Sequence, residues 1–277
     1  MSINTASTRL LDIGDVLSDT FAVIGRSFIV LANVAVMLIA IPAAIRIAGV
    51  ALTPVSPIFA LLTVIGWLAT GVGTLLAYGV IFQIAMQDLH GQAASTDLVF
   101  KVALSRLWPL AGMAILLAVG VILASLVLIV PGVILGKLGL GILLGLGMFL
   151  GGLLLIIVGV MLGLAWSVAM PALVLENRGV FESFKRSADL TRSKRWSIFL
   201  LYFLVVIVTV IMEVVLVAIF GGFHGLRSGQ PALAATALSS LLSVVTVPFG
   251  AVLSTALFDQ LRGREGYGAD AVAEVFA

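Results

Sequence analysis

Two charged residues, Arg46 and Glu213, lie inside long apolar stretches of the chain and are its first candidates for chemistry. An ionisable side chain in a membrane-crossing helix is costly, so it usually has a partner or lines water. Counted from the start of their stretches, both fall about 24 to 27 Å from the same membrane surface, so they could form an ion pair. The pair could be a proton or cation site, or it could have a structural role, as a buried strut or as side chains that snorkel to the outer surface. We favour the structural role, because one acid is little from which to build a transport path.

The second group of candidates belongs to the basic loop, residues 176–196, which separates two apolar stretches. Lysine and arginine beside membrane helices commonly meet anionic lipid headgroups. The candidate headgroup or partner contacts are Arg178, Lys185, Arg186, Arg192, Lys194 and Arg195. They are six of the fifteen Lys and Arg residues in the chain. Positively charged loops stay in the cytoplasm, so this loop sets the expected orientation of the protein.

Known catalytic and metal sites need side chains in combinations that this sequence does not offer. His90 and His224 are expected at opposite sides of the membrane, and the chain has no cysteine. No glycine-rich phosphate loop with a lysine follows a strand pattern. The net charge of +2, concentrated in one loop, does not suggest a nucleic-acid partner. We therefore assign no catalytic residue, no metal and no cofactor.

The elements that hold these residues are membrane helices, because 62% of the residues are hydrophobic and only 10% are charged. A soluble domain has about 25% charged residues. The apolar stretches predict an all-α, polytopic membrane protein in one domain. Its six expected crossings are at about 28–52, 58–86, 108–130, 140–175, 197–220 and 231–262. Pro131 with Gly132 is expected to end the third crossing, and small-residue pairs such as Gly159 with Gly163 allow close helix approach in the fourth.

The distribution of positive charge predicts which way the protein faces. On this topology twelve of the fifteen Lys and Arg residues lie on one side, which the positive-inside rule makes cytoplasmic. Both termini are then cytoplasmic, in a bacterial cytoplasmic membrane. The first 21 residues lack a basic segment followed by an apolar stretch and a cleavage site, so no cleaved signal peptide is expected.

The chain also shows a threefold pattern: an amphipathic surface helix, a basic and an aromatic residue, two crossings, then an acid or amide, a basic residue and glycine. The starts are Arg26-Ser-Phe28, Arg106-Leu-Trp108 and Arg195-Trp196, and the ends are Asp88–Gly91, Glu176–Gly179 and Gln260–Gly263. The glycine that closes each unit can adopt the left-handed conformation that ends a helix. We predict parallel repeats at 10–91, 95–179 and 180–263, with a tail at 264–277. Membrane hairpins that share these residue types at their helix ends, without duplication, would show a similar pattern.

The basic loop resembles a known family. The residues that carry the resemblance are Glu176, Ser183-Phe184, Arg186-Ser187, Leu190-Thr191, Arg195-Trp196 and the segment 258–266. They are similar to motifs of the membrane domain attached to some bacterial glycerophosphoryl diester phosphodiesterases and of stand-alone relatives. The resemblance implies six crossings in the same order. The phosphodiesterase activity of that family belongs to a separate soluble barrel, which we do not find here, so no catalytic residue is carried over.

These observations favour a non-enzymatic role. We expect a scaffold or lipid-organising protein whose basic cytoplasmic surface engages anionic lipid headgroups, with a protein partner or a homo-oligomer as further possibilities. The alternative is a transporter or channel for a small or amphiphilic solute, using Arg46, Glu213 and the hydroxyl residues of the sixth crossing. A lipid-modifying enzyme ranks third.

Overall fold

The computed structural model describes residues 12–92, 96–137, 141–219 and 231–276, and all regular secondary structure in these ranges is helical. The predicted all-α fold is confirmed. Six helical segments of the described chain are long and apolar enough to cross a membrane. They are Phe28–Leu52, Pro57–Leu89, Leu107–Val127, Leu150–Leu175, Arg195–Ala218 and Thr236–Gly263.

The first part of the chain is an amphipathic helix followed by a helical hairpin. The elements are α1 (Ile13–Arg26), α2 (Phe28–Ala35), η1 (Val36–Ala40), α3 (Ile41–Leu52), η2 (Pro57–Phe59) and α4 (Ala60–Leu89). The Asp12 carboxylate accepts a hydrogen bond from the Gly14 amide at 2.8 Å and so caps α1. One face of α1 buries Val16, Thr20 and Val23.

Close approach of α3 to α4 depends on three glycines. Pro42 has no N–H to offer the carbonyl of Leu38, and the chain widens into the π-helical turn η1 there. The Leu38 carbonyl oxygen lies against Gly73, where an added Cβ would be 1.9 Å away. Gly66 and Gly49 meet the partner backbone in the same way. The two backbones therefore touch along the hairpin without intervening side chains.

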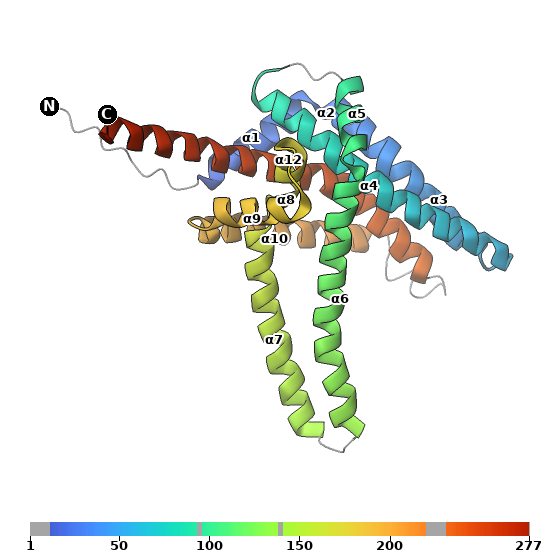
Figure 1. Ribbon diagram of the computed structural model, residues 1–277. Coiled ribbons are helices and arrows are strands. Elements are labelled where there is room, and N and C mark those ends of the chain that lie inside the picture. Colours follow the sequence, from blue (N-terminus) through green and yellow to red (C-terminus); the bar gives the residue numbers. More distant parts are fainter. Residues whose placement is uncertain (1–11, 93–95, 138–140, 220–230, 277) are drawn as a thin grey trace.

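The second hairpin projects away from the other helices (Figure 1). It comprises α5 (Thr96–Ser105), α6 (Leu107–Lys137), α7 (Gly141–Ala165) and α8 (Ala169–Leu175). The expected turn at Pro131 is wrong, because α6 continues to Lys137. A proline removes one helical hydrogen bond, and a long apolar helix can tolerate that loss. The pair Gly159 and Gly163 allows close helix approach, but no other helix of the described chain lies against it, since an added Cβ at either would meet nothing within 4 Å.

The third part consists of α9 (Val180–Thr191), α10 (Arg195–Ile219) and α12 (Pro231–Phe276). The sixth crossing begins at Pro231, as predicted. Its apolar span ends at Gly263, as predicted, although α12 continues as one helix into the expected tail. The rings of Phe249 on α12 and Phe21 on α1 lie 5.9 Å apart, so the last helix packs beside the first.

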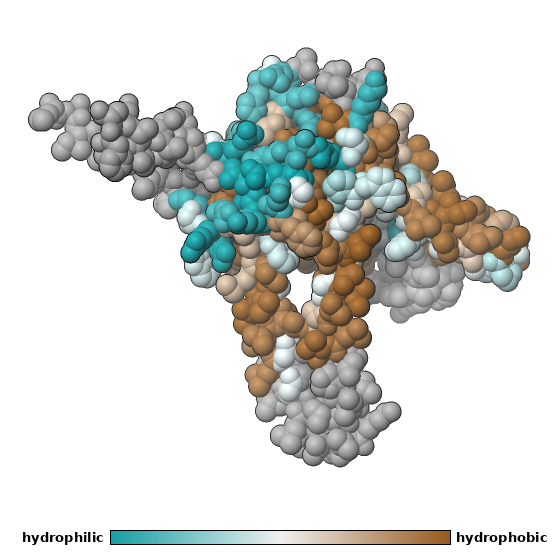
Figure 2. Space-filling model, viewed as in Figure 1, coloured by the Kyte–Doolittle hydropathy of each residue, from teal (hydrophilic) through white to brown (hydrophobic). Residues whose placement is uncertain are grey.

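Polar residues gather where α1, α5, α8 and α9 contact the ends of the long helices, and we call this region the polar end. The hydrophilic surface in Figure 2 lies there, whereas the long helices are covered by apolar side chains. Buried side chains such as Phe82, Leu173 and Phe258 form the core near the same end. Large side chains farther along the spans, including Trp67 and Ile211, are exposed, as expected for surfaces that meet lipid.

The order of elements agrees with the repeat but does not establish it. Each of the amphipathic helices α1, α5 and α9 precedes a pair of long helices. Gly91 has φ of +68° and ends the first unit as predicted. At the end of the second unit the left-handed residue is Asn177, with φ of 58°, and at the third Gly263 lies inside α12. Duplication therefore stays a prediction.

Candidate functional site

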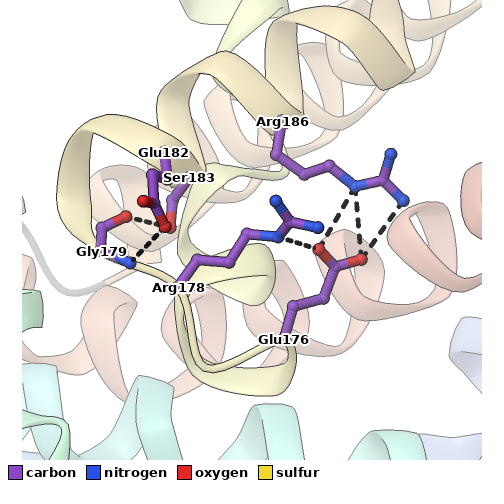
Figure 3. Close-up of polar contacts among 6 residues, drawn as sticks. All are labelled: Glu176, Arg178, Gly179, Glu182, Ser183 and Arg186. Carbon is purple, nitrogen blue, oxygen red and sulfur yellow. Dashed lines mark hydrogen bonds and ion pairs between the residues drawn. The ribbon is translucent and has the colours of Figure 1, made fainter.

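The basic loop folds around one carboxylate. Helix α8 ends at Leu175, Asn177 reverses the chain, and Glu176 between them receives two arginines. The Arg178 Nε donates to Glu176 Oε2 from two residues away. From α9, Arg186 Nε donates to the same oxygen at 3.2 Å and Arg186 Nη2 to Oε1 at 3.3 Å (Figure 3). This cluster joins the end of the fourth span to α9.

Glu176 neutralises only part of the charge that surrounds it. Its side chain is 10% exposed, whereas that of Arg178 is 42% exposed. Two guanidinium groups share one carboxylate, so one net positive charge remains. The cluster therefore connects the fourth span to α9 and also contributes positive charge to the surface.

Replacing Glu176 with glutamine is expected to lower the free energy of unfolding by about 2 kcal/mol, because two arginines lose their shared acceptor charge. The measurement is thermal unfolding of purified protein in detergent. Glu182→Gln is the control, since Glu182 is exposed and has only a 3.4 Å contact with the Gly179 amide. Equal unfolding midpoints for the two variants would show that the cluster contributes nothing particular.

The inner face of α9 is polar and fully buried. Ser183, Ser187 and Thr191 lie on it, each with no exposed surface. Ser187 Oγ donates to the carbonyl of Ala165 at 2.8 Å and accepts from the Val168 amide at 3.2 Å. These two backbone groups border the break between α7 and α8. Backbone groups that a break frees within a spanning helix must find partners inside the protein. The hydrogen bonds of Ser187 to these groups therefore hold α9 against the fourth span.

The outer face of α9 combines aromatic and basic side chains. Phe181 is 76% exposed, and Lys185 and Arg192 are exposed on the same side. Trp196, at the start of α10, is 80% exposed. Of the six predicted contacts, three are exposed and three are partly buried. The exposed ones are Arg178, Lys185 and Arg192, and the others are Arg186, Lys194 and Arg195.

Side chains at the starts and ends of the predicted repeats connect the amphipathic helix α1 to the polar end. Arg26 donates to Asp88 Oδ2 from Nε at 3.0 Å and from Nη2 at 2.8 Å. The hydrogen bond that Arg26 donates to Asp88, together with the negative charge of that carboxylate, raises the pKa of Arg26 above its ordinary value. At the end of the sixth span, Gln260 donates to Asp19 at 3.2 Å. The acid or amide that closes a hairpin therefore meets α1 in both cases.

The two intramembrane charges are not brought together. Arg46 on α3 donates from Nη2 to Ser240 Oγ on α12 at 2.8 Å. Glu213 is exposed on α10, and the described residues show no ion pair between it and Arg46. Helix α3 packs against α4 and α12, while α10 packs against α7, α12 and α1. Two residues at the same depth in the membrane need not be close together. The depth of a residue does not determine the direction in which its side chain points or which helix lies beside it.

Metal-ligating side chains do not cluster in the part of the chain that the structure describes. His90 Nε2 lies 3.7 Å from Asp259 Oδ1, a contact between the ends of the second and sixth spans. His224 falls outside the described residues.

Six apolar helical segments and a polar end define a helical, multi-pass membrane protein. The chain belongs to the family described as Domain of unknown function (DUF7847), whose profile matches residues 11–261. No match was found among curated proteins or among solved structures. The resemblance to the glycerophosphoryl diester phosphodiesterase membrane domain stays a prediction.

Proposed function

We propose that the protein is a non-enzymatic scaffold or lipid-organising protein of a bacterial cytoplasmic membrane, with both termini in the cytoplasm. The outer face of α9 binds anionic lipid headgroups at the cytoplasmic surface. The observation that carries the proposal is that Phe181, Lys185 and Arg192 are exposed on one side of α9, while its other side is buried against the spans.

The arrangement on α9 suits the boundary between lipid and water. An aromatic ring is favourable at headgroup depth, and lysine or arginine beside it can contact lipid phosphate. Lys185 and Arg192 make no ion pair among the described residues, so their charges remain available. Glu182 and Asp189 are also exposed on α9, which limits the basic surface to one side of the helix.

Neutralising the outer face of α9 tests this function. Each lysine or arginine near an anionic surface contributes about 1 kcal/mol, so Lys185→Gln with Arg192→Gln should weaken anionic-lipid binding by about thirtyfold. The measurement is the retention of phosphatidylglycerol by native mass spectrometry of protein released from nanodiscs. The control is Lys101→Gln with Arg106→Gln, which removes the same charge near α5. Unchanged retention in the α9 variant would contradict headgroup binding and leave a protein partner or a second copy as the ligand of this face.

A transporter for a small or amphiphilic solute is the second candidate. The Arg46–Ser240 contact favours it, because it places polar groups between α3 and α12 within the spans. The exposed position of Glu213 does not favour it, since a path through α3 and α12 would leave that acid outside.

A further inference from the structure

Arg46 is a cation in an apolar span whose charge the described residues do not balance. Its one hydrogen bond goes to Ser240, a neutral residue, and its Nε is buried without a partner. The ion pairs of the described chain all involve other residues. Charged side chains at membrane depth are normally paired with a counter-charge or with backbone carbonyls. Arg46 is therefore suited to an anionic ligand.

Ser240 orients the Arg46 guanidinium but accepts only one of its hydrogen bonds. The Ser240 hydroxyl donates to the Thr236 carbonyl at 2.6 Å, so its oxygen accepts from Arg46. A guanidinium carries five N–H donors in a planar fork that matches the oxygens of a phosphate. Ser240 is thus a positioning residue, and most of the fork remains for a ligand.

A second donor lies one helical turn farther from the polar end. Thr63 Oγ1 on α4 is buried without a hydrogen-bond partner. A Cβ at Gly49 would lie 2.6 Å from it, and a Cβ at Gly66 would lie 2.6 Å from the Cα of Arg46. Gly49 follows Arg46 by three residues, so the residue that contacts Thr63 lies about 5 Å from Arg46 along the axis of α3. Glycine at both positions lets the backbones of α3 and α4 touch there, which brings Thr63 against the helix that carries Arg46.

An open hollow lies beside Thr63 at the far end of the first hairpin. Thr63 also lines an open hollow of about 520 Å³, together with Val50, Thr53, Pro54, Ala60 and Val64. The first span has 25 residues and is about 37 Å long, whereas the hydrocarbon core is about 30 Å thick. Six residues separate Arg46 from the end of the span at Leu52, which places its Cα about 5 Å inside the hydrocarbon edge. A phosphate at that boundary can reach the guanidinium.

We propose that Arg46 and Thr63, with Ser240 as the positioning residue, form a binding site for a phosphate group at the end of the spans opposite the polar end. The phosphate is that of a lipid headgroup or of a free phosphate, and the two sources share the same recognition chemistry. The site is separate from the outer face of α9 and does not depend on the function proposed for it.

Ligand-dependent stability tests the site while allowing for variants that are less stable. Purified protein is heated in an uncharged detergent alone, with inorganic phosphate, or with phosphatidylglycerol, and the unfolding midpoint is read from tryptophan fluorescence. A ligand that binds only the folded state raises the midpoint. In a background that already carries Lys185→Gln and Arg192→Gln, so that the outer face of α9 does not contribute, a phosphate-bearing ligand should raise the midpoint. Arg46→Gln should abolish that gain whatever its own starting midpoint. Arg26→Gln is the control, because it removes an arginine at the polar end.

Two milder variants keep the test decisive if Arg46→Gln does not fold. Thr63→Val preserves shape and removes the hydroxyl, and Arg46→Lys keeps the charge and removes the fork. In the same background, each should reduce retention of phosphatidylglycerol in native mass spectrometry by at least about fivefold, a loss of roughly one hydrogen bond to a charged group. Stabilisation by inorganic phosphate identifies free phosphate as the ligand, and stabilisation by the lipid alone identifies a headgroup. A gain in midpoint that is equal in this background with and without Arg46→Gln or Thr63→Val would overturn the proposal.

Discussion

Gly73→Ala is expected to separate the first span, at η1, from α4 and to lower the free energy of unfolding by about 3 kcal/mol. The new Cβ would lie 1.9 Å from the carbonyl oxygen of Leu38, a contact that no side-chain rotation can relieve. The backbones would have to move apart. That movement would also disturb the contacts at Gly49 and Gly66, where an added Cβ would lie 2.4 Å and 2.5 Å from the partner backbone.

Gly71→Ala is the matched control, because an added Cβ there meets nothing within 4 Å. This variant should be as stable as the wild type or slightly more stable, since alanine favours helix by about 1 kcal/mol over glycine. Thermal unfolding of both variants, followed by circular dichroism in the same detergent, makes the comparison. Equal midpoints for Gly73→Ala and Gly71→Ala would show that the hairpin is not held by direct backbone contact.

These glycines show how far the sequence can predict the packing. Composition and length were sufficient for the spans, because a membrane imposes both on every crossing helix. They did not predict which glycines pack. Gly159 and Gly163 have the spacing of a contact motif but meet nothing, whereas Gly49, Gly66 and Gly73 carry the contact. The spacing states which residues share a helix face, and only the tertiary arrangement decides whether another helix covers that face.

The same reason limits prediction of the candidate sites. Charge count and amphipathic spacing were enough to select the basic loop, since both are properties of the local sequence. The depth of Arg46 was also accessible, but its contact with Ser240 was not, because 194 positions separate the two residues. The role of Ser187 had no signal in the sequence either. It depends on a break between α7 and α8 inside a stretch that reads as one continuous apolar run.

Ser187→Ala is expected to cost about 3 kcal/mol of stability, although it removes a single oxygen atom. The variant leaves the Ala165 carbonyl and the Val168 amide without the partner that Ser187 provides. A buried polar group without a partner costs about 1 to 3 kcal/mol, and water cannot easily replace the hydroxyl at this site. Because α9 is fastened to the spans by the same contacts, the variant should also release the outer face of α9. Hydrogen exchange measured by mass spectrometry should then rise in residues 180–191.

Two other hydroxyl deletions separate this effect from the general cost of losing a hydroxyl group. Thr191→Val should lower the stability less, by about 1 kcal/mol. Thr191 Oγ1 donates mainly to the backbone carbonyl of Ser187 in its own helix, at 2.9 Å, and lies 3.4 Å from the Ala165 carbonyl. Ser105→Ala should change little, since its hydroxyl is exposed and meets only the local carbonyl of Val102. The expected order of stability is Ser105→Ala, Thr191→Val, then Ser187→Ala. If Ser187→Ala instead matched Ser105→Ala in both unfolding and exchange, α9 would have to be held by its apolar contacts alone, and the orientation of its basic outer face would no longer depend on the break in the fourth span.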